Sequence, residues 1–186
     1  MHWLNEPPCW RTDGNTLHVT TGEKTDFWRE THYGFIRDGG HLYFERAGGD
    51  FTAEVTVAGS YQTLYDQAGL MLRIDERNWI KAGLEFVGGK RLLSCVVTRE
   101  ASDWSIVSGF DAPEVLTIRL TRQGTAARVE WTSGHGAAFE TFRLAYFPLS
   151  DEALIGPMCC SPQRAGFQVR FDGFNIEPSA VDEFDD

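Results

Sequence analysis

Hydrophobic and polar residues alternate with a period of two along most of the chain, which is the pattern of half-buried β-strands. The clearest segment is FTAEVTVAG (51–59), where apolar residues occupy one face and Thr or Glu the other. Turn sequences such as GGK, RQG and SGHG separate about a dozen segments of this kind. This spacing predicts an all-β fold, an antiparallel sandwich of two sheets.

One segment has helical character. SDEALIG (150–156) offers Ser150 as an N-cap and places Asp151 and Glu152 in the first turn, so we expect one helical turn there. No repeat or linker divides residues 1–178, which predicts a single sandwich domain over that range. Residues 179–186 are strongly acidic and are predicted to form a flexible tail.

Two consecutive hairpins can be placed in register from their pattern. YDQAGLMLRIDERNWIKAGLEF (65–86) sorts core residues onto one face only if its loop spans the five residues 74–78. A two-residue turn at 88–89 then fixes the register of the third strand. In this register Gly69, Gly83 and Ser94 lie side by side on three neighbouring strands.

We expect this row of small residues to form a trough with a backbone floor. Gln67 and Glu85 flank it on one side, and Arg73, Trp79 and Lys81 on the other. Two interpretations stand: an aromatic side chain fills the trough, or a hydroxylated ligand such as a sugar lies in it. The flanking carboxylate, amide, cationic and indole groups suit the second, in which an aromatic ring could also form one wall.

Three segments resemble a known family. TDFWRETHYGF (25–35), the hairpin 65–86 and VRFDGFNIEP (169–178) together resemble the domain of unknown function 1349, over about residues 1–178. The resemblance implies a concanavalin A-like jelly-roll sandwich of two antiparallel sheets and, by analogy with lectins, sugar binding. The family includes a yeast regulator of enolase levels and galactose metabolism, which implies a regulatory role.

The family pattern marks the four residues 26–29 in the first segment, and it marks Asp66 together with trough residues in the second. Trp28 and His32 are further candidates beside the groove, although Trp28 also suits the core and His32 also suits the surface. The candidate ligand-binding residues are therefore Trp28, His32, Asp66, Gln67, Gly69, Arg73, Trp79, Lys81, Gly83, Glu85 and Ser94. The predicted partner is a carbohydrate or small polar metabolite.

Two alternatives to sugar binding use the same face of the predicted sheet. A glycoside hydrolase normally needs two carboxyl groups roughly 5–10 Å apart, and no predicted strand carries such a pair at positions i and i+2. Asp66 and Glu85 would converge only through a bulge, so binding is preferred to catalysis, with Glu85 as candidate acid or base assisted by Lys81 or His32. The second alternative is a protein-interaction surface without a small ligand.

The charge and the cysteine content limit the kinds of partner and the cellular location that we expect for this protein. The formal charge of −10, without a basic run, excludes nucleic acid and anionic membranes as predicted partners. No export signal or spanning segment is recognisable, and four cysteines without CxxC spacing predict buried reduced thiols in a cytoplasmic protein. Histidine spacing predicts no transition-metal site, and no cofactor is implied. The acidic loops 75–78 and 171–175 offer oxygen ligands, so a structural calcium site in one of them stays an open alternative.

Overall fold

The computed structural model describes residues 1–109, 111–134 and 137–179, and these residues form sixteen strands and no helix. The strands are β1 (His2–Leu4), β2 (Cys9–Asp13), β3 (Thr16–Thr20), β4 (Phe27–Arg29), β5 (Ile36–Asp38), β6 (His41–Ala47), β7 (Phe51–Gly59), β8 (Gln67–Arg73), β9 (Asn78–Val87), β10 (Lys90–Arg99), β11 (Ala101–Val107), β12 (Val115–Gln123), β13 (Ala126–Thr132), β14 (Glu140–Tyr146), β15 (Ala153–Cys160) and β16 (Gln168–Pro178).

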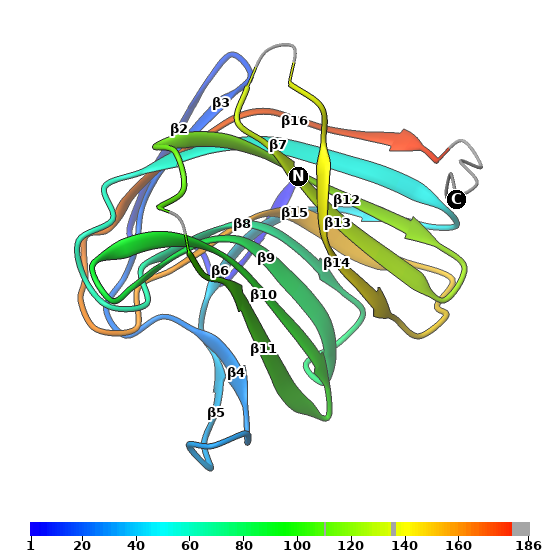
Figure 1. Cartoon of the computed structure of the whole chain (residues 1–186), viewed down its shortest axis with the longest axis horizontal. Helices are drawn as coiled ribbons and strands as arrows, with labels where there is room; N and C mark the ends of the chain where they lie inside the picture. Colours follow the sequence, from blue (N-terminus) through cyan, green and yellow to red (C-terminus); the bar gives the residue numbers. More distant parts are fainter. Residues whose placement is uncertain (110, 135–136, 180–186) are drawn as a thin grey trace.

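Two seven-stranded antiparallel sheets pack face to face (Figure 1). The first sheet has the order β1-β6-β15-β8-β9-β10-β11, and the second has the order β14-β13-β12-β7-β16-β3-β2. Strand β7 shows why they stack: its alternating residues Phe51, Ala53, Val55 and Val57 are buried between the sheets, while the residues between them are half-exposed. The predicted all-β sandwich is confirmed.

The expected helical turn at residues 150–156 is wrong. Residues from Ala153 onward form β15, which pairs with β6 on one side and β8 on the other. Hydrogen bonding to two neighbouring strands outweighs the local capping pattern around Ser150. Most of the predicted acidic tail, residues 180–186, lies outside the described part of the chain.

The predicted hairpin registers match the structure. Gln67 pairs with Glu85 and Gly69 with Gly83 across β8 and β9. The Gly88-Gly89 turn leads into β10, where Ser94 pairs with Gly83. Gly69, Gly83 and Ser94 therefore do form one row across three strands.

Little free space remains beside this row, so of the two interpretations of the trough the open ligand groove above the glycines is wrong. A Cβ on Gly69 would lie 2.0 Å from the carbonyl oxygen of Ala82, and one on Gly83 would lie 2.1 Å from that of Ala68. The two glycines thus permit close approach of two strand backbones. The space left beside the row, bordered by Met158, is about 10 Å³, roughly the room for one water.

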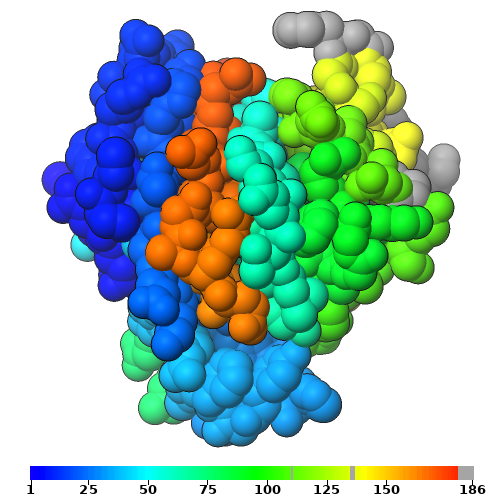
Figure 2. Space-filling model, turned by 90° about the vertical axis from the view of Figure 1, so that its left-hand side faces the viewer, coloured from blue at the N-terminus to red at the C-terminus, as the bar shows by residue number. Residues whose placement is uncertain are grey.

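The first sheet is covered on both faces near its middle. All seven residues of β8 are buried, because one face meets the second sheet and the other lies under a second apolar cluster. This cluster includes Phe27, whose side chain is fully buried. Phe27 belongs to residues 26–38, a short hairpin of β4 and β5 that we call the arm and that projects at the bottom of Figures 1 and 2.

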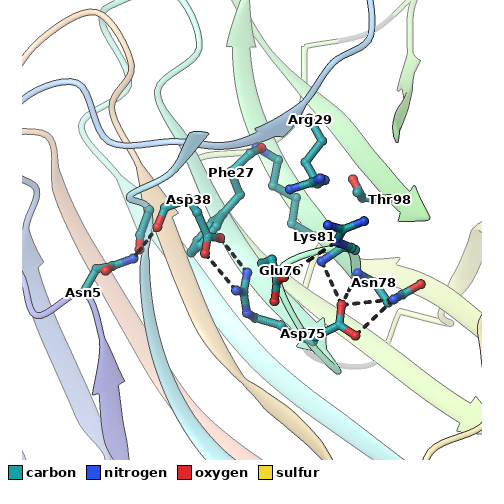
Figure 3. Close-up of polar contacts among 12 residues, drawn as sticks. Asn5, Phe27, Arg29, Asp38, Asp75, Glu76, Asn78, Lys81 and Thr98 are labelled. Carbon is teal, nitrogen blue, oxygen red and sulfur yellow. Dashed lines mark hydrogen bonds and ion pairs between the residues drawn. The ribbon is translucent and has the colours of Figure 1, made fainter. Parts of the chain in front are cut away.

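Polar contacts hold the arm against the first sheet (Figure 3). Arg73 donates two hydrogen bonds to the Asp38 carboxylate at 2.7 and 2.9 Å, and Lys81 donates to the Phe27 carbonyl at 2.7 Å. Arg29 donates from Nε to the Glu100 carbonyl at 3.0 Å. The arm and the sheet together enclose the candidate site.

Candidate functional site

A cavity of about 130 Å³ lies beside the closed glycine row, between the arm and the first sheet. The sheet contributes Gln67, Lys81, Glu85, Val96 and Trp104. The remaining lining residues come from the arm and two loops: Asp26, Trp28, Tyr33, Phe35, Tyr65, Pro162 and Gln163. Of the candidates named from the sequence, Trp28, Gln67, Lys81 and Glu85 are brought together here.

Glu85 is the buried acid of the cavity, with 6% of its surface exposed. Its Oε2 atom accepts hydrogen bonds from Ser94 Oγ at 2.6 Å and from Trp104 Nε1 at 2.9 Å. Among the described residues no donor reaches Oε1. Burial raises the pKa of Glu85 above its ordinary value, although Lys81 and the two hydrogen bonds act in the opposite direction.

Lys81 lies on the same face of β9 and is paired with the arm. Its Nζ is 3.0 Å from Asp26 Oδ1, in addition to its bond to the Phe27 carbonyl. Burial by itself would lower the pKa of Lys81, but attraction to Asp26 and Glu85 outweighs it and raises the pKa. The ammonium group is therefore charged, with its charge matched by Asp26.

Aromatic rings form most of the remaining wall. The Tyr33 ring stacks on Phe35 at 5.2 Å and meets Trp28 edge-on at 5.8 Å. The hydroxyl groups of Tyr33 and Tyr65 are 3.1 Å apart, which links the arm to the loop before β8. This hydrogen bond, with burial and the nearby carboxylates, raises the pKa of Tyr65 to about 12.

The Tyr65 backbone is unusual, because its φ of 68° is a left-handed conformation that bulky residues rarely adopt. Its amide donates to the Phe86 carbonyl at 2.8 Å. The ring is thereby held edge-on to Trp104, with centroids 6.4 Å apart. Strain of this kind is common where a side chain must be aimed at a site.

The other seven candidates from the sequence lie outside the cavity lining. Arg73 is committed to Asp38, and Trp79 is buried in the second apolar cluster beside Phe27. His32 is exposed in the turn of the arm, with its ring edge-on to Tyr33. Gly69, Gly83 and Ser94 lie beside the cavity, and Ser94 acts on the site through its bond to Glu85.

Asp66 also lies outside the cavity, in a structural clamp. It is fully buried, accepts hydrogen bonds from the amides of Gln62 and Thr63, and forms an ion pair with Arg164 at 2.6 Å. Ser161 Oγ donates to its other oxygen at 3.1 Å. The clamp joins the two loops that carry Tyr65 and residues 162–163, so Asp66 supports the site from behind.

Four aromatic lining residues were not predicted from the sequence: Tyr33, Phe35, Tyr65 and Trp104. Extending the register one strand further would have found Trp104, since it pairs with Val96 beside Ser94. No comparable signal places the arm, because its contacts with the sheet join residues 35 to 73 positions apart.

A larger hollow of about 840 Å³ lies on the outer face of the second sheet. Arg11, His18 and Arg170 form a cross-strand row in it. These side chains are exposed or half-exposed, and Arg170 already pairs with Asp172 at 2.8 Å. The cavity at Glu85 is the better candidate, because its charged groups are buried and converge.

Metal and thiol chemistry add little to this picture. Within residues 1–109, 111–134 and 137–179, no cluster of three or more His, Cys, Asp or Glu side chains could hold a metal ion. All four cysteines are free thiols; three are buried, but Cys9 is exposed, which corrects the expectation that all are buried. The described residues contain no helix long and apolar enough to cross a bilayer.

The two packed antiparallel sheets define the chain as a β-sandwich protein. Solved structures with little sequence similarity share this fold. A carbohydrate-binding module, CBM66 from Bacillus subtilis, is 13% identical and superposes with a TM-score of 0.57 over 94% of each chain. A glycoside hydrolase family 43 protein from Bacillus licheniformis is 15% identical, with a TM-score of 0.69 over 94% of this chain and 36% of that chain.

The chain belongs to the family described as protein of unknown function DUF1349, which matches residues 3–179. It is 45% identical to Regulation of enolase protein 1 of Saccharomyces cerevisiae, over 94% of this chain and 87% of the yeast protein. A crystal structure of a functionally unknown protein from S. cerevisiae is 42% identical, with a TM-score of 0.92 over 96% of each chain.

Proposed function

We propose that the protein binds a single sugar ring, or a sugar-derived metabolite of that size, in the cavity between the arm and the first sheet. The observation that carries this proposal is the convergence of buried polar groups from Gln67, Lys81 and Glu85 on a cavity walled by aromatic rings. Aromatic faces pack against the apolar face of a sugar, and the polar groups bond its hydroxyls.

The size of the cavity limits the ligand. Pockets for drug-sized molecules measure about 300–1,000 Å³, whereas this one measures about 130 Å³. One ring fits this scale and an oligosaccharide does not. The sandwich folds of the carbohydrate-binding module and the glycosidase support the proposal by analogy only.

We infer a regulatory role in carbohydrate metabolism, in which the sugar-bound protein acts on a protein partner. The support is the name of the yeast relative, Regulation of enolase protein 1. The arm is the element best placed to signal ligand binding to a partner, because it lies between the cavity and solvent and contributes four of the lining residues. Co-purification of the tagged protein from its source, with and without sugar, tests this part.

Calorimetric titration with a panel of monosaccharides tests the ligand. We expect saturable binding to the wild-type protein and its loss in Glu85→Ala, with Glu45→Ala as a matched control because Glu45 is an exposed strand residue. Incubation with aryl glycosides tests the hydrolytic alternative, for which Asp26 would be the second carboxyl group in the cavity. A panel without any binding would refute the proposal.

A further inference from the structure

The charges around the cavity do not balance. Lys81 is matched by Asp26 at 3.0 Å, which leaves Glu85 without a cationic hydrogen-bond partner among the residues that the structure describes. The groups that bond Glu85 are neutral, a serine hydroxyl and an indole N–H, and both bond the same oxygen, Oε2. A buried carboxylate in this state is costly unless a further donor or a cation reaches it.

The Oε1 atom of Glu85 is the carboxylate oxygen that remains for a ligand. Glu85 lines the cavity, and Oε1 receives no hydrogen bond from the described residues although the side chain is only 6% exposed. Water or a bound ligand must therefore supply the donor at this atom, and a ligand that brings its own donor replaces the water. Such a donor would form a charge-assisted hydrogen bond, which is roughly twice as strong as a neutral one.

The walls of the cavity suit a cation. Five aromatic side chains line it, those of Trp28, Tyr33, Phe35, Tyr65 and Trp104. The faces of such rings attract ammonium groups, and rings grouped around a small space are the recurrent means of binding them. An anionic ligand such as a sugar phosphate would instead meet two carboxylates, Asp26 and Glu85, against one ammonium group.

We propose that the ligand of this cavity is a sugar carrying a protonated amine, with the ammonium group placed against Glu85 Oε1 and the aromatic wall. The proposal rests on the proposed function, because it names the class of sugar that the same cavity takes. An amino sugar differs from its parent by one ammonium group in place of one hydroxyl, so it has the same size as the ring that the cavity accommodates.

Calorimetric titration with size-matched pairs tests the proposal. D-glucosamine is compared with D-glucose, and D-galactosamine with D-galactose, at about pH 7, which lies below the pKa of roughly 7.7–8.0 typical of an α-amino group. We expect at least one amino sugar to bind ten or more times as tightly as its neutral parent. In Glu85→Gln the preference should fall below about threefold, because the amide still accepts a hydrogen bond but carries no charge.

The outcomes separate this proposal from the proposed function. If a neutral sugar binds as tightly as the matching amino sugar, the proposed preference for an amine is refuted, but the proposal of sugar binding stands. Absence of binding by all four sugars overturns both. If the preference for the amino sugar persists in Glu85→Gln, the proposed role of Glu85 is refuted. The comparison on the wild-type protein tests the preference for an amine even if that variant does not fold.

Discussion

Substitution of Gly69 by alanine tests why two glycines face each other across β8 and β9. The added Cβ would lie 2.0 Å from the Ala82 carbonyl oxygen and 2.6 Å from the Gly83 Cα. Real Cβ contacts are essentially never shorter than 3.0 Å, so the two backbones must separate locally by about 1 Å. Both strands lie in the interior of the sheet and are paired on both sides, which leaves little freedom to move.

The expected loss of unfolding free energy is about 3 kcal/mol. Overpacking in a well-packed core costs about 1–3 kcal/mol, and distortion of one or two ladder hydrogen bonds adds roughly 1 kcal/mol each. Replacement of glycine in the unfolded chain returns about 0.4–1 kcal/mol. At roughly 2–4 °C per kcal/mol for a domain of this size, the Tm should fall by about 6–12 °C.

Thermal and urea denaturation of the variant measure this loss. Gly39→Ala is the matched control, because a Cβ there meets no atom within 4 Å, and we expect it to change stability by less than about 0.5 kcal/mol. If Gly69→Ala keeps the wild-type Tm but loses sugar binding, the close-approach argument is refuted and the glycine row is a ligand floor after all.

Three further predictions follow from buried charge and thiol placement. Asp66→Asn should lower the unfolding free energy by about 3 kcal/mol in urea denaturation, since it breaks a buried ion pair with Arg164; an unchanged midpoint would contradict the clamp. Glu85→Gln should raise it by about 1 kcal/mol at pH 7, because no cationic side chain in the described part of the chain bonds the buried carboxylate. Because the pKa of Glu85 is raised in the folded state, this gain should be absent below about pH 4.3, where Glu85 is protonated in both states. It should grow between that pH and the raised folded-state pKa and stay constant above it. A gain independent of pH would point to packing instead. A thiol reagent should label one cysteine per native chain, the exposed Cys9, and all four after denaturation; rapid labelling of a second thiol in the native protein would show that a cysteine assigned to the interior is accessible.

Local patterns were enough to predict the sheet register. The alternation in β8, β9 and β10 leaves one pairing that keeps charged residues out of the inter-sheet core, and the Gly88-Gly89 turn fixes the third strand. The pattern alone therefore assigns Gln67, Lys81 and Glu85 to one face of the sheet. Period-two patterning carries this information because side chains on a strand alternate strictly between the two faces.

The same patterns led to an incorrect picture of the glycine row. Sequence shows that Gly69 and Gly83 lack side chains, but it does not show how close the two backbones come. The sequence pattern also predicted Asp66 as a ligand-binding residue. In the structure Asp66 instead forms an ion pair with Arg164, 98 positions away in sequence, in the clamp between two loops. Contacts between such distant positions depend on the packed fold, which local propensity does not describe.

The sequence by itself determined that this chain is a two-sheet β-sandwich and which residues share the face that holds Glu85, because strand periodicity and turn chemistry are local properties. Only the tertiary structure decided that this face is covered. The arm is joined to the sheet by Arg73 and Lys81, which bond Asp38 and the Phe27 carbonyl across 35 and 54 positions of sequence. Its packing turns this face of the sheet into one wall of a small aromatic cavity, and long-range packing of this kind has no signature in the alternation of single strands.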